Sequence, residues 1–433
     1  MSGFLERYDA APDAEKWKVL LGAVKADGSD GAKADAVFAE LRERRPVLLA
    51  PPGGPFGRVG MVTRMADVRD VLERWTVFTV RPYAPKMDSV VGEFMLARDD
   101  TETNQRDKGL MLVVLSRRDL PAVREAVGAS CERAIARDRA SGEIDVVGRL
   151  GRGVSLALCA SYFGFPGPEP TALARWSRAT QHDMFHNLLG DPTVHEANLA
   201  AGREMRAYLD ELIPRRRAAL VTDPMRDDIL SRLLKLRPPA ALGFDQERVA
   251  ANVMGLLVGM VETTSAAVAQ AVDRLLDRPD ALADATEAAR RGDHETVSRH
   301  VWEALRFNPV NPFVARLGVS PYTVAAGTKH ATEFPAGTLL LAGTRSAMRD
   351  PAAFLEPETY RTDRPAHGYL HLGYGPHACL GAHISRVHVP ETVRQLLLLQ
   401  GLRRAEGPAG RPDFRGGPFP ERFTVAFDAG EAC

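Results

Sequence analysis

One long apolar segment limits the folds open to this chain more than any other feature. Residues 246–276 are rich in helix-forming residues, and Asp245 before them is a good helix N-cap. From Val253 to Val261 nearly every residue is apolar. A helix that is apolar on every side is normally buried, and this run is far shorter than the ~20 residues needed to cross a bilayer. The segment therefore predicts a buried central helix.

The rest of the pattern predicts a mainly α fold with a small β portion. Apolar residues three and four positions apart predict further helices over residues 183–212 and 226–236. Strand signals are few, and they cover residues 59–63, 313–318, 322–325 and 339–341.

Length and charge narrow the class of protein further. A length of 433 residues would by itself suggest about three domains, but no repeat or long linker divides the chain, so we expect one domain over residues 1–433. Lys plus Arg equals Asp plus Glu at 56 each, which gives no indication of a nucleic-acid partner or a membrane anchor. The first residues lack the charged stretch and apolar run of a secretory signal. We expect a cytoplasmic protein.

The four cysteines are Cys131, Cys159, Cys379 and Cys433. They are widely spaced and form no CxxC pair, so they indicate neither a disulfide framework nor a zinc site. Cys131 and Cys159 lie in helical patterns and are expected in the core, and Cys433 is expected to be exposed. Cys379 differs because glycines surround it.

The stretch around this cysteine reads Leu372-Gly373-Tyr374-Gly375-Pro376-His377-Ala378-Cys379-Leu380-Gly381. Gly373 and Gly375 allow positive φ angles that aim backbone N–H groups at the sulfur. Gly381 permits a close approach as a new helix begins, and the N-terminal dipole of that helix favours a thiolate. An isolated cysteine in a glycine turn is usually a core residue, and the length of the pattern argues against that interpretation here.

The same stretch resembles the signature of the cytochrome P-450 family, in which a Phe-Gly-x-Gly-x-His-x-Cys-x-Gly loop wraps the proximal face of haem. The resemblance implies that Cys379 is the axial ligand of a haem b iron, where a thiolate favours O–O cleavage. It also implies that Leu372 and the three glycines of the loop lie against the cofactor. Leu372 replaces the usual Phe, which removes ring packing near the sulfur.

Three further stretches resemble motifs of this family, and one of them, residues 349–360, resembles its approach to the segment before the cysteine loop. Glu303-Ala304-Leu305-Arg306 resembles its Glu-x-x-Arg helix, with Arg364 as the expected partner of Glu303 in a structural role. Gly259-Met260-Val261-Glu262-Thr263-Thr264 resembles its oxygen-activation motif.

In this last motif the resemblance implies that Gly259 lets the helix run close over the iron, and that Glu262 and Thr263 relay protons. Other interpretations remain open. The threonine hydroxyls can bond backward to carbonyls four residues earlier, and Glu262 can be stabilised simply by pairing. Met260 stands where the family usually has a small residue, which narrows or reshapes the distal pocket.

Haem propionates need cationic or hydrogen-bonding partners, and the resemblance implies Arg316 and His377 for this role. The alternatives are a surface charge for Arg316 and a plain turn residue for His377. The family's His-x-x-x-Arg clamp is not clearly present, and Asn104 and Lys108 are the nearest equivalents by spacing.

Two other features concern helices. His182 and His186 are expected to be solvated or helix-packing residues, because no third metal ligand is evident nearby. Pro390 is expected to end or kink the helix after the cysteine loop.

The resemblance implies a monooxygenase that inserts one oxygen atom from O2 into a hydrophobic small molecule. Electrons would come from a separate ferredoxin- or flavodoxin-type protein and its reductase, because the chain has no nicotinamide, flavin or iron–sulfur fingerprint. Two alternatives remain: a peroxide-using or hydroperoxide-rearranging haem-thiolate enzyme, and a non-enzymatic helical binding protein, which would be colourless.

Overall fold

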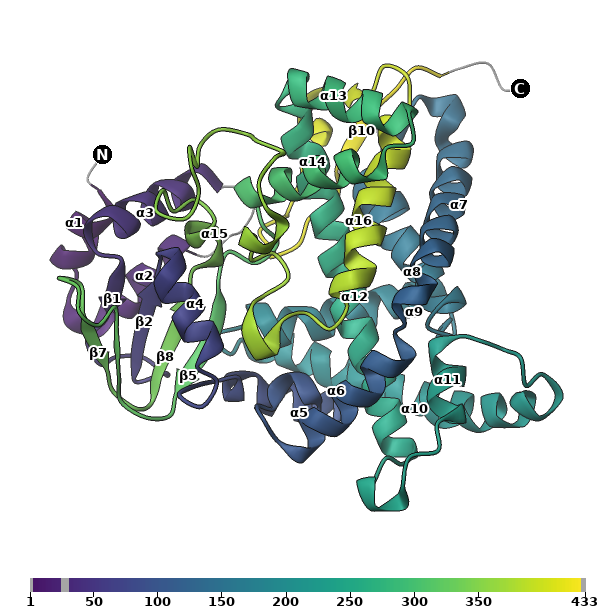
Figure 1. Ribbon diagram of the computed structural model, residues 1–433, viewed down its shortest axis with the longest axis horizontal. Coiled ribbons are helices and arrows are strands. Elements are labelled where there is room, and N and C mark those ends of the chain that lie inside the picture. The colour runs from purple at the N-terminus through teal and green to yellow at the C-terminus, as the bar shows by residue number, and fades with distance from the viewer. Residues whose placement is uncertain (1–2, 25–30, 430–433) are drawn as a thin grey trace. The chain divides into compact units, whose positions relative to one another are not determined.

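A computed structural model describes residues 3–24 and 31–429 of the chain, so the expected exposure of Cys433 lies outside the described residues. Most of these residues are helical, and the strands form small sheets (Figure 1). Contacts divide the chain into two compact units: unit 1 comprises residues 1–82, 299–379 and 414–418, and unit 2 comprises residues 83–298, 380–413 and 419–433. The single domain expected over residues 1–433 stays a prediction.

Unit 1 contains a five-stranded sheet and a hairpin. The strand order is β1-β2-β8-β5-β3, with β2 and β8 parallel and the other pairs antiparallel. The strands of the sheet and hairpin are β1 (Val47–Leu49), β2 (Arg58–Val62), β3 (Phe78–Thr79), β5 (Val314–Gly318), β6 (Tyr322–Val324), β7 (Thr332–Phe334) and β8 (Thr338–Ala342). All four predicted strand segments are confirmed. The sequence pattern missed β1, β3 and β7, which are too short for a clear alternation.

The helices of unit 1 lie mainly near its N-terminal segment. They are α1 (Phe4–Ala10), α2 (Lys16–Val24), α3 (Gly31–Arg44), α4 (Met65–Glu73) and α15 (Thr344–Ala347), and most of α14 (His294–Phe307) also belongs to this unit. Apolar residues of α4 pack with those of β8 and β1 in a buried core.

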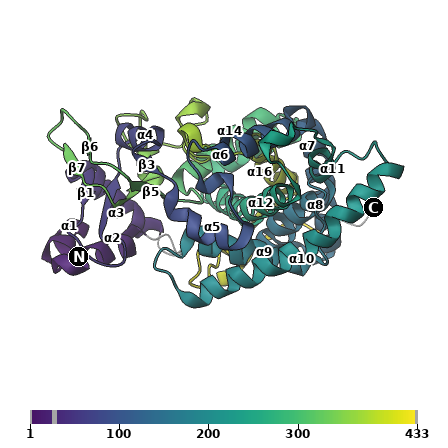
Figure 2. The ribbon, with the colours of Figure 1, turned by 90° about the horizontal axis from the view of Figure 1, so that it is seen from below.

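Unit 2 is mostly helical. Its helices are α5 (Ala84–Val91), α6 (Glu102–Val114), α7 (Leu120–Asp138), α8 (Gly153–Ser161), α9 (Pro170–Gln181), α10 (Pro192–Thr222), α11 (Ile229–Lys235), α12 (Gln246–Leu276), α13 (Pro279–Arg290) and α16 (Ala382–Leu397). A small antiparallel sheet joins β4 (Glu143–Asp145), β10 (Thr424–Ala426) and β9 (Arg403–Arg404). Helix α12 lies among the helices of this unit, against α8, α9, α10 and α16 (Figure 2).

The predicted central helix is confirmed as α12. It begins after Asp245, whose side chain accepts a hydrogen bond from the N–H of Arg248 at 3.0 Å. Among the described residues it is the one helix long and apolar enough to cross a membrane, and 78% of its apolar window is buried inside the protein. Packing against neighbouring helices therefore accounts for its apolar character.

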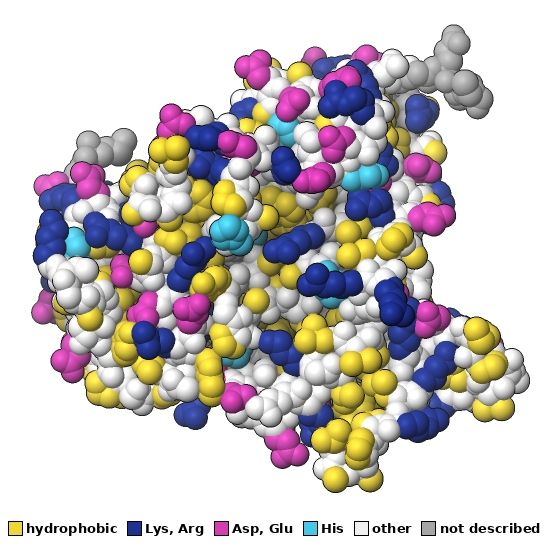
Figure 3. Space-filling model, in the orientation of Figure 1, with side chains coloured by type: hydrophobic (Ala, Val, Ile, Leu, Met, Phe, Trp, Pro, Cys, Tyr) yellow, Lys and Arg dark blue, Asp and Glu magenta, His cyan; other side chains and the backbone are white. Residues whose placement is uncertain are grey.

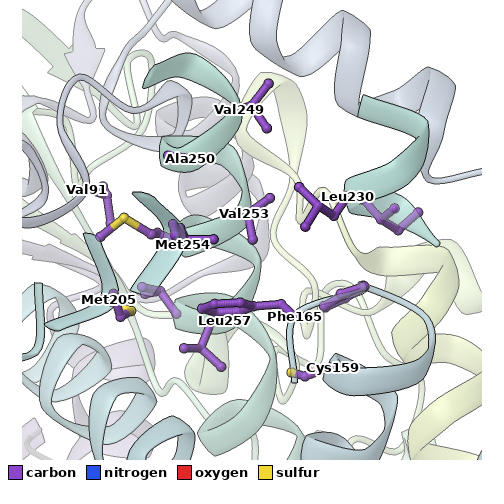
Figure 4. Packing of buried hydrophobic residues seen from close by; sticks show 14 of the residues in the cluster. Val91, Cys159, Phe165, Met205, Leu230, Val249, Ala250, Val253, Met254 and Leu257 are labelled. Atoms are coloured by element: carbon purple, nitrogen blue, oxygen red, sulfur yellow. The ribbon is translucent and has the colours of Figure 1, made fainter. Parts of the chain in front are cut away.

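The largest core of unit 2 forms around α12. Val253, Met254 and Leu257 project from this helix toward Phe165 and Leu230 and toward apolar residues of α5 and α10 (Figure 4). Cys159 belongs to the same cluster, and Cys131 is also fully buried, so both are core residues as expected.

One helix prediction was wrong, and one was wrong in part. The helix predicted over residues 183–212 is broken, because a π-helical turn covers His182–His186 and α10 begins only at Pro192. Gly190 has a φ of 74°, and Asp191 caps the new helix by accepting from the N–H of Thr193. Pro192 then takes the first helical position, where a missing N–H costs little.

Pro390 was expected to end or kink the helix after the cysteine loop. It does not end α16, which continues to Leu397, and the kink stays a prediction. Pro390 is itself buried, and α16 packs against α7, α12 and α13 along its length. This packing outweighs the loss of one backbone hydrogen bond, which costs about 3 kcal/mol in a helix interior.

The interior of α16 makes stability sensitive to acid. His388 is 1% exposed, its Nε2 has no hydrogen-bond partner among the described residues, and burial lowers its pKa from 6.5 to about 4. As pH falls below 6.5 the unfolded chain binds a proton at this residue that the folded chain does not. The free energy of unfolding therefore falls, by about 3 kcal/mol in all when the pH reaches 4.

We predict that His388→Leu removes this contribution. Denaturant unfolding at pH 7 and at pH 4 gives the free energy of unfolding of both proteins. Between these two pH values the wild type should lose about 3 kcal/mol more than the variant. The same pH dependence in both proteins would contradict the prediction.

Candidate active site

The cysteine loop of unit 1 is closed by its own backbone. The N–H of Cys379 donates to the carbonyl of Leu372 at 2.7 Å, and the N–H of Ala378 donates to the carbonyl of Gly375 at 3.1 Å. These bonds bring the two ends of the loop together and leave Cys379 exposed, unlike the buried Cys131 and Cys159. A thiol held in this way can approach a ligand outside the loop.

Gly373 and Gly375 have the backbone angles that the sequence predicted. Gly373 has a φ of 75° and Gly375 a φ of 69°, in the region that side chains disfavour. At Gly375 a Cβ atom would lie 2.9 Å from the carbonyl oxygen of Leu72 in α4. Both the conformation and the packing of the loop against α4 therefore require glycine.

A buried ion cluster stabilises the segment that leads into this loop. Glu303 and Arg306 are both 0% exposed and form two hydrogen bonds, of 2.8 and 2.9 Å. The predicted partner Arg364 is confirmed, since its Nε lies 3.2 Å from Glu303. Tyr369, three residues before the loop, donates its hydroxyl to Glu303 at 2.8 Å. Burial, together with the charge of Glu303, raises the pKa of Tyr369 and keeps its hydroxyl a donor.

In unit 2, one stripe of α12 is open although the rest of the helix is buried. Leu256, Met260 and Thr263 are half-buried and Gly259 is exposed. These positions are three or four residues apart and share one face. A Cβ at Gly259 would meet no atom within 4 Å. The stripe leaves room for a ligand beside the middle of the helix.

Glu262 lies on a different side of α12 and is fully paired. It is 1% exposed, and Arg152 donates Nε and Nη2 to its two oxygens at 2.9 and 3.0 Å. Arg178 approaches the same carboxylate at 3.3 Å and also bonds Glu421. Arg152 further donates to the carbonyl of Pro420 at 3.0 Å. The cluster thus joins α12 and α9 to the C-terminal segment 420–421.

A close backbone contact sets the position of Arg152. Arg152 is the last residue of a π-helical segment, Val146–Arg152. The residue before it, Gly151, lies so close to α12 that a Cβ there would be 2.7 Å from the Cα of Ser265. Burial of Arg152 opposes its charge, but the hydrogen bonds and charge of Glu262, with the charge of Glu421, raise its pKa. Arg152 therefore carries a positive charge beside Glu262 over the whole physiological range.

Glu262 and Thr263 turn to different partners. The hydroxyl of Thr263 donates to the carbonyl of Gly259 at 2.5 Å, which is the backward bond that the sequence left open as an alternative. Glu262 is likewise paired, with Arg152, which is the alternative that the sequence left open for it. The proton relay assigned to these two residues stays a prediction.

The residues assigned to propionates have different surroundings. Arg316 lies on β5 and is 5% exposed, with Nη1 donating to the carbonyl of Ala315 at 2.8 Å, so the surface-charge alternative was wrong. His377 is half-buried in the loop and Lys108 is half-buried on α6. Asn104 donates to the carbonyls of Met95 and Arg98, so its amide is committed to the local backbone.

The other histidines singled out pack as expected. His182 and His186 lie edge-on to Phe419, with ring centroids 6.3 and 4.9 Å away. Within residues 3–24 and 31–429 no group of three His, Cys, Asp or Glu residues could hold a metal ion.

The residues present fit a haem group. An axial ligand needs an exposed sulfur on a fixed loop, and Cys379 provides one. A flat macrocycle needs an open, largely apolar helix face, and the stripe with Leu256, Gly259 and Met260 provides that.

Sequence reasoning missed Arg152, Arg178 and Glu421. They are 110, 84 and 159 positions from Glu262, so no local spacing could have revealed them. The one available signal was physical, because a buried carboxylate in an apolar helix requires cations from other elements.

Comparison with known proteins agrees with this geometry. The family model for Cytochrome P450 matches residues 172–399, more than half of the chain. The mycinamicin IV hydroxylase/epoxidase of Micromonospora griseorubida is 28% identical over 84% of this chain and 88% of its own length. The vitamin D(3) 25-hydroxylase of Pseudonocardia autotrophica is 26% identical over 81% of this chain and 82% of its own.

Solved structures agree in fold. CalO2 superposes with a TM-score of 0.76 over 91% of this chain and 95% of its own, at 22% identity. P450BioI, solved with a hexadec-9Z-enoic acid-ligated acyl carrier protein, superposes with a TM-score of 0.77 over 93% of this chain and 100% of its own, at 18% identity. The chain belongs to the cytochrome P450 family. It is accordingly a haem-thiolate monooxygenase with haem b as its cofactor.

The Glu303 cluster provides a test of the structural core of this family. We predict that Glu303→Gln lowers the free energy of unfolding by roughly 3–5 kcal/mol, because it leaves buried arginines without their counter-charge. Asp363→Asn is the control, since the Arg361–Asp363 pair is solvent-exposed and should contribute little. Urea unfolding of the three proteins measures the difference. Equal losses for both variants would contradict the assignment.

Proposed function

We propose that this monooxygenase acts on a hydrophobic organic small molecule within a single haem domain in the cytoplasm. The observation that carries the proposal is the open stripe of α12, where Leu256 and Met260 flank Gly259. Apolar side chains of a large cluster continue on either side of this helix. Pockets for small organic ligands are mostly apolar with few polar groups. Two relatives are named as hydroxylases.

The chain's own residues then have defined roles. Cys379 provides the axial thiolate, and Leu372, Gly373, Gly375 and Gly381 shape the loop around it. Gly259 leaves space for dioxygen beside α12. Arg316, His377 and Lys108 bind the propionates. When bound, the haem iron activates dioxygen so that one oxygen atom can enter the substrate.

Proton delivery is assigned to Thr263 and Glu262. The Thr263 hydroxyl donates its hydrogen bond to the Gly259 carbonyl. Its oxygen can therefore accept a hydrogen bond from another group while this bond is kept. To donate, it must rotate away from that carbonyl. Glu262 is paired with Arg152 and Arg178, and one of these ion pairs must open before its side chain can pass on a proton.

Replacing the hydroxyl tests this assignment. We predict that Thr263→Ala slows or uncouples reductase-driven turnover by at least about tenfold and leaves peroxide-driven turnover unchanged. Thr263→Ser, which keeps the hydroxyl, should retain most of the activity. Product yield per electron donor consumed is the measurement. An unchanged yield in Thr263→Ala would remove Thr263 from the relay.

We further propose a ferredoxin- or flavodoxin-type electron donor with an acidic surface, which a reductase supplies with electrons. Basic side chains gather over α16, α7 and α6 on the face in Figure 3. Arg117 and Arg118, just before α7, and Arg386 of α16 are exposed. His383, one turn before Arg386, bonds the carbonyl of Leu115 at 2.9 Å, so the start of α16 lies beside the Arg117 segment. A positive face steers a negative partner and speeds its association.

Charge reversal tests the docking face. We predict that Arg117→Glu with Arg118→Glu raises the KM for an acidic ferredoxin severalfold at low salt, and that the difference shrinks at high salt. Arg217→Glu, an exposed change on α10, is the control. Steady-state reduction of the enzyme across ionic strengths gives both values. A KM unaffected by the double change would exclude this face.

Use of peroxide is a second candidate, favoured by two observations. Leu372 replaces an aromatic ring near the sulfur, and the Thr263 hydroxyl is bonded to the backbone. Product formed with peroxide alone, at a rate that no reductase system exceeds, would favour this chemistry.

A further inference from the structure

One buried amide on α9 lacks the hydrogen bonds that its neighbours have. Gln181 is 3% exposed, and its Oε1 has no hydrogen-bond partner among the described residues. Ser177 and Thr180 are equally buried, but their hydroxyls donate to the carbonyls of Leu257 and Trp176. A buried polar group without a partner is costly, and in native proteins it usually has a function or binds a ligand or water.

The position of Gln181 on α9 shows where this amide points. Successive residues of a helix are turned by about 100°, so Gln181 is turned by about 40° from Ser177 and by about 60° from Arg178, on the side between them. Ser177 contacts α12 at Leu257. Arg178 contacts Glu262 and lies over the ring of Phe419 at 5.3 Å. Gln181 is therefore directed between α12 and the C-terminal segment that begins at Phe419.

Apolar side chains follow this amide along the chain. Met184 and Phe185, which follow it in the π-helical turn, belong to or pack against the apolar cluster that includes Leu257 of α12. His182 packs edge-on to Phe419. An apolar binding site with one polar group is the usual composition of a site that orients a hydrophobic ligand.

We infer that Gln181 is a specificity-determining residue, whose amide oxygen accepts a hydrogen bond from a hydroxyl group on an otherwise hydrophobic substrate. The inference rests on the proposed function, because it refines the substrate class of that reaction. The hydroxyl satisfies the amide only when substrate is bound. The chain therefore carries an unsatisfied group in the free enzyme and recovers its cost on binding.

Gln181→Met tests this inference, because Met has a similar shape and no amide. Two results are expected with the holoenzyme. The variant unfolds at a higher temperature than the wild type when no ligand is present, because the buried amide is gone. It also loses the wild type's preference for linear C8–C12 alcohols over their methyl ethers, with alcohol binding weaker by about tenfold and ether binding unchanged. Equilibrium dialysis of each alcohol and ether measures the preference.

Ser177→Ala is the matched control on the same helix face. It should lower the unfolding temperature and affect both ligands equally, because its hydroxyl is already bonded to Leu257. If Gln181→Met unfolds at a lower temperature and binds both ligands as before, the amide binds an ordered water only, and the inference is overturned.

A wild type without preference for the alcohols, including one that binds none of them, also overturns it. Failure of the proposed function would be distinguishable, because it would appear as a lack of oxygenated product in the wild type itself, whichever ligand is preferred.

Discussion

A thiolate can serve as a metal ligand only where the chain holds it still and keeps it accessible. In this protein backbone groups of the loop around Cys379 serve both needs, with the N–H of Cys379 donating to the carbonyl of Leu372 and positive φ angles at Gly373 and Gly375. The Glu303–Arg306–Arg364 cluster and Tyr369 stabilise the segment that leads into the loop. The buried charges of unit 1 thus support the geometry of one exposed sulfur.

Helix α12 meets a different constraint, because it is almost wholly buried and yet carries a carboxylate. Two arginines neutralise Glu262, and a second carboxylate, Glu421, balances them. These two arginines and two carboxylates together carry no net charge, so the apolar core contains no uncompensated charge. The neighbouring stripe with Gly259 remains open. The helix can therefore be packed tightly on most sides and still present one face to a ligand.

The sequence predicted what local patterns encode. The bounds of α12, strands β2, β5 and β8 of the five-stranded sheet, the conformation of the cysteine loop and the pairing of Glu303 with Arg364 all follow from short motifs. Features that depend on contacts between distant segments were not predicted. The partners of Glu262 come from segments far away in the chain, and tertiary packing carries α16 through Pro390 against local preference.

The break before α10 was missed for another reason. Gly190, Asp191 and Pro192 were present as signals, but the helical periodicity on both sides was given more weight. The amide of Gln181 could not have been singled out from the sequence, since its lack of a partner depends on the orientation of α9 against α12.

The absorbance spectrum of the purified protein, reduced and exposed to carbon monoxide, tests the central claim most directly. The account predicts a haem-thiolate spectrum for the wild type and for Cys159→Ser, whose sulfur is buried away from solvent, and the loss of that spectrum in Cys379→Ser. A colourless wild-type protein, or a spectrum unchanged by Cys379→Ser, would contradict it.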